Sequence, residues 1–258
     1  MKKLAIVGCG KLARIVAQAV ADNILDGYTL VGALSRSRSS AEAIARITPC
    51  AVCDSLDELL SLKPDYVVEA ASPAAMRDMA IPTLQAGVNI VTLSIGAFAD
   101  DTFYASVMQT AQEAGSRVYI VSGATGGFDV LQTVALMGGA KAKFFNEKGP
   151  NALRGTAVYD EALQTEQRTV FTGTASEAIA MFPTKVNVTV AASRASVGPS
   201  NMHVTMQSTP TFVGDTQRVE IENDQVRAVV DVYSRTAEIA AWSVVSTLKN
   251  LQSPIVFV

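Results

Sequence analysis

The sequence predicts an α/β protein with an N-terminal doubly wound parallel sheet and a smaller α+β domain whose sheet is mainly antiparallel. In the first half of the 258 residues, short apolar runs alternate with helical patterns, and a glycine-rich turn follows the first run. In the second half, strand patterns are separated by Pro, Gly and Asn-Asp turn signals. With 49% hydrophobic residues and a net charge of −3, the composition is that of a globular protein.

Six parallel strands are expected in the first half. Each is a nearly continuous apolar run, as a strand buried on both faces of a sheet requires. Two of the intervening helices have clear ends: Ser72 and Pro73 fit the N-cap and first position of one, and Gly115 fits the end of another. Right-handed crossovers place such helices on both faces of the sheet. The expected strands are 4–7, 28–34, 51–53, 66–69, 88–93 and 117–121.

The second half has a different organisation. Thr174 and Glu177 form a capping box for a helix that ends near Phe182 and Pro183. The elements expected after it are strands at 202–208, 218–223 and 226–233, a helix at 236–251 and a last strand at 254–257.

A glycine motif lies between the first strand and the first helix. The stretch GCGKLA, which begins at Gly8, has the spacing G-x-G-x-x-A. Gly8 permits the tight turn, Gly10 lets the backbone approach a pyrophosphate, and the small last residue lets helix and strand pack. Lys11 and Leu12 begin the helix, whose free N–H groups attract phosphate. The motif predicts a dinucleotide-binding Rossmann domain, and an ordinary strand–helix turn is the alternative.

The segment after the second strand favours NADP over NAD. An acidic residue there would bond the ribose 2′-hydroxyl of NAD, but residues 34–38 contain none. Ser35 and Arg36 instead offer donors for a 2′-phosphate. A solvated basic loop is the other interpretation. Ala71, Ser72 and Pro73 follow the fourth strand, at the sheet edge where doubly wound folds bind ligands, and are further cofactor candidates.

Several classes of site are excluded by the residues that the chain lacks. His203 is the single histidine, so a three-histidine zinc site is impossible within the chain. Neither a G-x-S-x-G elbow nor a phosphate-binding G-x-x-x-x-G-K-[ST] loop occurs. Cys50 and Cys53 form a C-x-x-C without a second pair, which we interpret as small residues flanking a strand. No metal is expected.

The chain is expected to have three parts: the Rossmann domain in 1–123, a substrate and catalytic domain in 124–235, and a C-terminal helix in 236–258 that packs back on the first domain. The apolar stretch 4–9 is too short for a secretion signal, and no window approaches the roughly 18 apolar residues of a membrane span. We therefore expect a cytoplasmic protein. The mild acidity and the lack of a basic run argue against nucleic-acid and membrane partners.

Five further motifs follow the glycine turn and extend over nearly the whole chain. They are EAASP from Glu69, LSIGAFAD from Leu93, SGATGGFD from Ser122, the stretch 171–187, and NMH from Asn201. Together these segments resemble the L-aspartate dehydrogenase family. Members of that family oxidise L-aspartate to iminoaspartate with NAD or NADP. The imine hydrolyses to oxaloacetate and ammonia or feeds NAD biosynthesis.

The resemblance implies roles for individual residues. His203 corresponds to the active-site histidine, and Ala124 and Asn187 correspond to positions that contact the cofactor. A neutral imidazole accepts the proton of a substrate ammonium near neutral pH. The alternation of residues 202–207 places His203 on the polar face of its strand, although a lone histidine is more often structural. Lys148 begins a segment that resembles the family's interdomain linker.

The segment before the last helix departs from the family, which has Pro-Lys-Thr-Ser where this chain has residues 234–237, SRTA. Arg235 and Thr236, together with Asn201, are the candidates for binding the substrate. The departure removes one hydroxyl and replaces Lys by Arg, which changes the groups that can hold a substrate carboxylate. Asp129 either orients the histidine or caps a helix.

The sequence thus predicts an NAD(P)-dependent amino-acid dehydrogenase, with L-aspartate as the first choice of substrate. A homodimer is expected by analogy with the family. Two alternatives stay open: a reductase of another carboxylated imine or carbonyl, and a catalytically silent NADP(H)-binding sensor.

Overall fold

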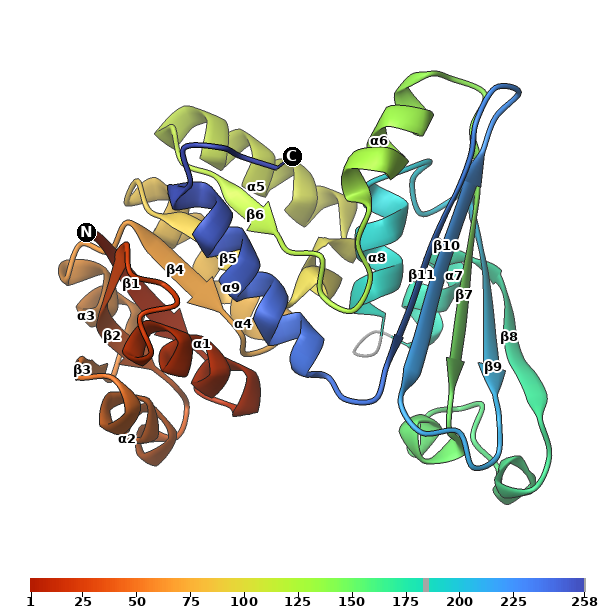
Figure 1. Cartoon of the computed structure of the whole chain (residues 1–258), viewed down its shortest axis with the longest axis horizontal. Helices are drawn as coiled ribbons and strands as arrows, with labels where there is room; N and C mark the ends of the chain where they lie inside the picture. Colours follow the sequence, from red (N-terminus) through yellow and green to blue (C-terminus); the bar gives the residue numbers. More distant parts are fainter. Residues whose placement is uncertain (183–185, 258) are drawn as a thin grey trace. The chain divides into compact units, whose positions relative to one another are not determined.

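The computed structural model describes residues 1–182 and 186–257 (Figure 1). The chain divides into two compact units. Met1–Gly123 and Glu238–Val258 form the first, and Ala124–Ala237 form the second. The second unit ends at Ala237, two residues after the boundary that the sequence predicts at 235. Pro183, near which the sequence predicts the end of a helix, lies outside the described residues.

The first unit contains a six-stranded parallel sheet in the order β3-β2-β1-β4-β5-β6. Strand order reverses beside β1, which creates the kind of edge position where doubly wound folds bind ligands. The strands are β1 (Lys2–Val7), β2 (Tyr28–Leu34), β3 (Ala51–Cys53), β4 (Tyr66–Glu69), β5 (Asn89–Thr92) and β6 (Val118–Ile120). The helices are α1 (Lys11–Ala21), α2 (Arg38–Ile47), α3 (Leu56–Ser61), α4 (Pro73–Gln85), α5 (Asp101–Ala114) and α9 (Glu238–Gln252).

Helices cover both faces of this sheet, as the continuous apolar strands predict. Leu4 and Ile6 of β1 belong to a core cluster that includes residues of α1, α2 and α9. Ala5 and Val7, which point the other way, belong to a second cluster with Leu59 of α3. Both faces of β1 are therefore buried, and the fold is the Rossmann-like sheet that the glycine motif predicts.

The last helix, α9, completes the core of the first unit. It packs against α1 and contributes Val244 and Leu248 to the first cluster (Figure 1). The Tyr28 hydroxyl donates a 2.8 Å hydrogen bond to the Leu248 carbonyl, and Gly123 N–H donates to Ser243 Oγ at 3.0 Å. Residues 254–257, for which the sequence predicts a strand, form none.

The second unit contains a mixed sheet in the order β11-β10-β7-β9-β8. Strands β7 and β9 pair in parallel, and the other neighbours pair antiparallel. Three helices pack against this sheet and cover one of its faces (Figure 1). The strands are β7 (Lys141–Lys148), β8 (Arg168–Thr174), β9 (Met202–Ser208), β10 (Asp215–Glu222) and β11 (Arg227–Ser234); the helices are α6 (Phe128–Leu136), α7 (Ala175–Met181) and α8 (Asn187–Arg194).

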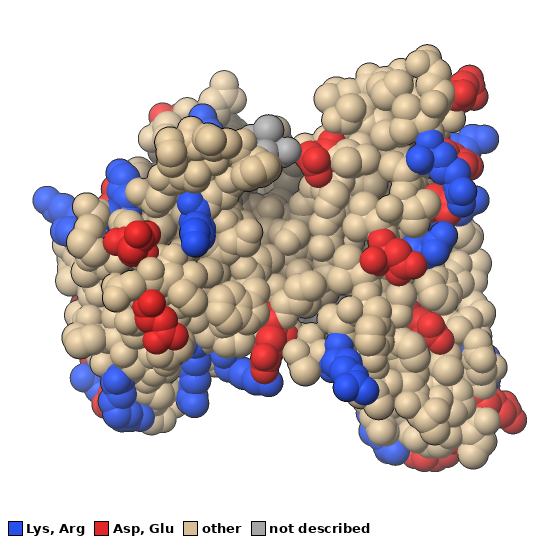
Figure 2. Space-filling model, in the orientation of Figure 1, with Lys and Arg blue, Asp and Glu red and all other residues tan. Residues whose placement is uncertain are grey.

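The surface carries no large area of one charge on the face seen in Figure 2, where basic and acidic side chains of the described residues are interspersed. None of the helices in residues 1–182 and 186–257 is both long and apolar enough to cross a membrane.

A buried carboxylate joins the ends of β4 and β5. The Glu69 side chain is fully buried. Its Oε1 accepts hydrogen bonds from Ala71 N–H (2.8 Å), Ser72 N–H (3.1 Å) and Ser94 Oγ (2.8 Å). Its Oε2 accepts from Thr92 Oγ1 (2.7 Å) and Ser94 N–H (3.2 Å). These five donors replace the water that the charge loses on burial. The carboxylate thereby fixes the turns that follow both strands.

Glu69→Gln is expected to destabilise the first unit by about 2–3 kcal/mol, since an amide N–H₂ in place of either oxygen faces other donors. For a chain of this size that lowers Tm by roughly 4–12 °C. Thermal denaturation measures the change. Glu113→Gln, an exposed change on α5, is the control. Equal melting temperatures of the two variants would show that the buried Glu69 carboxylate contributes no more stability than the exposed carboxylate of Glu113.

Candidate functional site

The turn from β1 into α1 is packed tightly against the turn that follows β4. Gly8 has φ +89°, and a Cβ there would lie 2.5 Å from the Ala71 backbone. Gly8 N–H also donates to the Leu34 carbonyl at 2.9 Å. The intervening Cys9 is buried, which raises the pKa of its thiol to about 11. Cys9 is thus a packing residue, and Gly8 is required by both its backbone angle and its neighbour.

Gly10 has the opposite surroundings. A Cβ at Gly10 would meet no protein atom within 4 Å. Gly10 is also the N-cap of α1 and supplies no side-chain acceptor to the first-turn N–H groups. The result is an open, electropositive space at a helix start, which a pyrophosphate fits. Lys11 is ion-paired with Glu238 at 2.8 Å. Leu12 is partly buried in the first turn of the helix. These residues fit a dinucleotide.

The loop after β2 presents one unpaired arginine. Ser35 is partly buried and Arg36 is exposed. Arg38, two residues later, is paired with Asp54 and Glu42. Among the described residues Arg36 has no such carboxylate partner, so its guanidinium is free to bind an anion.

The turn after β4 keeps its predicted cofactor candidates beside Gly8. Ser72 Oγ accepts a hydrogen bond from Ala75 N–H at 3.2 Å, and Pro73 occupies the first position of α4. The N–H groups of Ala71 and Ser72 are held by Glu69, as described above. This turn therefore caps α4 and is fixed by Glu69 at the sheet edge where the sequence predicts the cofactor.

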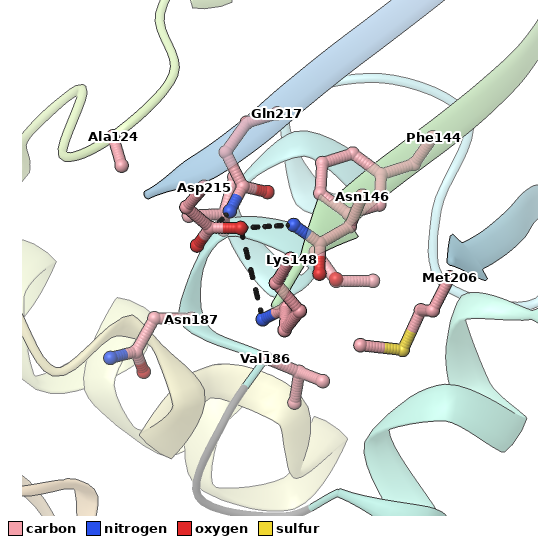
Figure 3. Close-up of a pocket in the computed structure, with 11 residues that line it drawn as sticks. Ala124, Phe144, Asn146, Lys148, Val186, Asn187, Met206, Asp215 and Gln217 are labelled. Atoms are coloured by element: carbon pink, nitrogen blue, oxygen red, sulfur yellow. Dashed lines mark hydrogen bonds and ion pairs between the residues drawn. The ribbon is translucent and has the colours of Figure 1, made fainter. Parts of the chain in front are cut away.

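A pocket of about 160 Å³ opens within the second unit (Figure 3). It is smaller than the roughly 300–1,000 Å³ of pockets for drug-sized ligands, so its size fits a small metabolite. Its walls come from β7, β9, β10, the first turn of α8 and the start of the unit. The lining residues are Ala124, Phe144, Asn146, Lys148, Val186, Asn187, Val188, Thr189, Met206, Asp215 and Gln217.

Polar side chains converge on one carboxylate in this pocket (Figure 3). Asp215 Oδ1 accepts a hydrogen bond from Asn146 Nδ2 at 2.6 Å and lies 3.9 Å from Lys148 Nζ. Asp215 Oδ2 accepts from Gln217 Nε2 at 2.7 Å. Burial raises the pKa of Asp215 above its usual value, against the opposing effect of the Lys148 charge and the two hydrogen bonds. The pocket thus holds a cation and a carboxylate that is fixed by two of the three amide side chains of the lining.

The structure brings two of the predicted site residues of this unit to the pocket. Ala124 and Asn187, expected to contact the cofactor, both line it. Asn201, Arg235 and Thr236, the candidates for binding substrate, are exposed and do not line it.

His203 lies on the other face of the sheet. Its strand alternates, so His203 points away from the face that carries the pocket residue Met206. The cross-strand neighbours of His203 are Lys143 and Thr174, and the histidine is exposed. Asp129 is exposed in the first turn of α6. The catalytic role predicted for His203 stays a prediction.

Sequence reasoning missed the polar centre of the pocket. Asn146, Asp215 and Gln217 were not singled out, and Lys148 was noted only as part of a linker. A signal exists in β7, where inward positions carry Ala142 and Phe144 and then change to Asn146 and Lys148. Buried polar residues at apolar positions of a strand indicate a site.

Comparison with known proteins gives consistent results along the whole chain. A family model described as "Homoserine dehydrogenase, NAD binding domain" matches residues 8–121, and one described as "Aspartate dehydrogenase, C-terminal" matches 129–251. An L-aspartate dehydrogenase of Methanococcus maripaludis is 31% identical over 99% of this chain and 98% of its own length. L-aspartate dehydrogenase 2 of Bordetella bronchiseptica is 29% identical over 96% of each chain.

Solved structures show the same fold. The crystal structure of aspartate dehydrogenase from Thermotoga maritima superposes with a TM-score of 0.79 at 24% identity, covering 100% of both chains. A hyperthermophilic archaeal homoserine dehydrogenase in complex with NADPH gives a TM-score of 0.65 at 14% identity, covering 99% of both chains.

The two glycines of the nucleotide turn are expected to respond differently to alanine. Gly8→Ala clashes with the Ala71 backbone at a positive φ and is expected to destabilise the unit by about 1–3 kcal/mol. Gly10→Ala has room to fold normally, but its methyl group fills the space for the pyrophosphate. We expect weakened NADPH binding at unchanged Tm. Fluorescence titration and thermal melting separate the two effects, and unchanged NADPH affinity in Gly10→Ala would argue against this turn as the cofactor site.

Proposed function

The chain belongs to the L-aspartate dehydrogenase family, and we propose from this premise that it oxidises L-aspartate to iminoaspartate with NAD(P)⁺. The observation that carries the proposal is the match over nearly the full length of both chains to a relative of that name. The nucleotide turn at Gly8 and Gly10 supports the cofactor, and the small charged pocket in the second unit supports a small charged substrate.

Each unit contains residues that we propose for a part of the chemistry. A bound oxidised nicotinamide would supply the acceptor for the hydride of the substrate Cα. The backbone at Gly10 and the first turn of α1 would hold the pyrophosphate, since this helix start has no side-chain cap. Ser35 and Arg36 would bind the ribose phosphate, and by the resemblance Ala124 and Asn187 would contact the cofactor. The proton of the substrate ammonium requires an acceptor, because the amine gives up hydride only after deprotonation.

The resemblance assigns that acceptor role to His203, and substrate contacts to Asn201, Arg235 and Thr236. For His203 this assignment requires a substrate on the exposed face of β9, opposite the pocket. His203→Ala is the variant that tests it, and turnover close to that of the wild type would remove the role.

The activity is measured as reduction of NADP⁺ or NAD⁺ by L-aspartate at alkaline pH, followed by absorbance. We expect turnover with L-aspartate and little with L-alanine, since the pocket presents a cation for a second carboxylate. A panel of amino acids and oxoacids covers the alternative of a related reductase. If NADPH binds and no compound of the panel reacts, the chain is a cofactor-binding sensor and the proposed activity is excluded.

NADP(H) is proposed as the preferred cofactor, supported by the exposed Arg36 and by the lack of an acidic residue at the end of β2. Arg36→Ala is expected to weaken NADPH binding roughly 10- to 150-fold, because a hydrogen bond to a charged group contributes about 1.5–3 kcal/mol. NADH binding is expected to change little and serves as the internal control. Equal losses for both cofactors would contradict a 2′-phosphate contact.

We also propose a cytoplasmic homodimer. The face of the second sheet opposite α6, α7 and α8 carries the exposed Val229 and Tyr233, which a second copy would cover. Light scattering that returned the mass of one chain would exclude the dimer.

A further inference from the structure

We propose that Asp215 is the catalytic base, the group that takes a proton from the ammonium of the substrate, with Lys148 beside it binding a substrate carboxylate. The inference deepens the proposed function and rests on it. It assigns proton transfer to the pocket of the second unit (Figure 3) and leaves His203 outside the reaction.

The geometry prepares Asp215 as an acceptor. Asn146 and Gln217 hold one oxygen each, at 2.6 and 2.7 Å, so the carboxylate has a fixed orientation. Asn146 Nδ2 also donates to the Thr216 carbonyl at 2.9 Å and is thereby fixed itself. A carboxylate has about four lone-pair sites, and two hydrogen bonds leave room for a substrate N–H.

A cation and a helix start complete the pocket. The Lys148 side chain is only 11% exposed and lies 3.9 Å from Asp215, so it is a buried charge that faces the pocket. The first turn of α8 also lines the pocket, and its N-cap, Val186, has no side-chain acceptor. Both features attract a carboxylate. L-Aspartate carries a second, side-chain carboxylate near its ammonium, and Asp215 with Lys148 beside it complements this pair of charges.

The proposed step is balanced. One N–H bond of the substrate ammonium breaks and an O–H bond forms on Asp215, which leaves a neutral amine. The C–H bond at Cα then breaks, its electron pair leaves as hydride to the cofactor, and a C=N bond forms. The products are the protonated imine, the reduced cofactor and neutral Asp215, which later releases its proton to water. Burial raises the pKa of Asp215, and this makes it a stronger base than an exposed aspartate.

The sheet geometry separates this pocket from His203. Asn146 and Met206 are register partners on the pocket face, whereas His203 pairs with Lys143 on the opposite face. A group on one face of a sheet does not reach a substrate held on the other. A base at Asp215 and a base at His203 therefore predict different effects of substitution on turnover, and variants of the two residues distinguish these hypotheses.

The experiment compares three variants that remove one group each. Asp215→Asn keeps the shape and removes the base, so kcat is expected to fall by about 10²–10⁴-fold. His203→Gln removes the competing acceptor, and a fall in its kcat as large as that of Asp215→Asn would assign the proton transfer to His203 instead. Asp231→Asn is the matched control, an exposed aspartate of the same sheet that pairs with Arg218 at 3.1 Å, and it is expected to keep kcat within about twofold. Melting temperature and NADPH affinity confirm that each variant folds.

The pH profile provides a second readout that a structural role would not change. In the wild type, kcat/KM is expected to fall at acid pH as Asp215 takes up its proton. The Lys148 charge lowers the pKa of Asp215, so Lys148→Met is expected to move this limb to higher pH, while His203→Gln leaves it in place. Lys148→Met also raises KM for aspartate. If Asp215→Asn fails to fold, the pH profile of Lys148→Met tests the role of Asp215 by itself.

The possible results are distinguishable. Loss of turnover in Asp215→Asn with normal His203→Gln supports the inference. If the wild type is active and Asp215→Asn turns over normally, the inference is overturned and the proposed function is not. The same holds if Lys148→Met leaves the acid limb of the pH profile unmoved. A wild type that oxidises no amino acid overturns both.

Discussion

The burial of the Glu69 carboxylate is the constraint on which the nucleotide turn depends. A fully buried charge is tolerated only because five donors surround it, and those donors belong to the turns after β4 and β5. The same interaction fixes Ala71, whose backbone leaves no space for a Cβ at Gly8. A charge buried beneath the sheet edge thus requires a glycine at a position far away in the sequence.

The second unit also contains charged side chains that are largely or partly removed from water, and here they line a pocket. Lys148 and Asp215 are charged groups at positions of β7 and β10 that face the helices, where apolar residues would stabilise the sheet more simply. Asn146 and Gln217 compensate by hydrogen bonding to the carboxylate. Removing one member of such a set leaves an uncompensated charge. Replacing the whole set by apolar residues would cost little stability, so stability alone does not explain its presence. Its place in a pocket supports the substrate site proposed above.

The first unit was predictable because its signals are local. Apolar runs, the glycine spacing and the Ser72-Pro73 helix start each depend on a few neighbouring residues, and the structure forms the corresponding elements. Strands β7 and β8 were missed, since inward-facing Asn146 and Lys148 interrupt the apolar pattern of β7 and a register shift after Thr169 interrupts β8. Alternation placed His203 on the polar face of β9, but which face holds the pocket depends on how β7, β9 and β10 pair.

The position of α9 has a consequence for how the protein is made. Val244 and Leu248 fill the core beside α1, but the ribosome adds them only after the whole second unit. A nascent chain that has reached residue 123 therefore has its six strands and lacks one wall of its core. Its hydrophobic surface stays accessible to chaperones until α9 has been synthesised. Premature termination within the second unit therefore leaves the first unit without α9 as well.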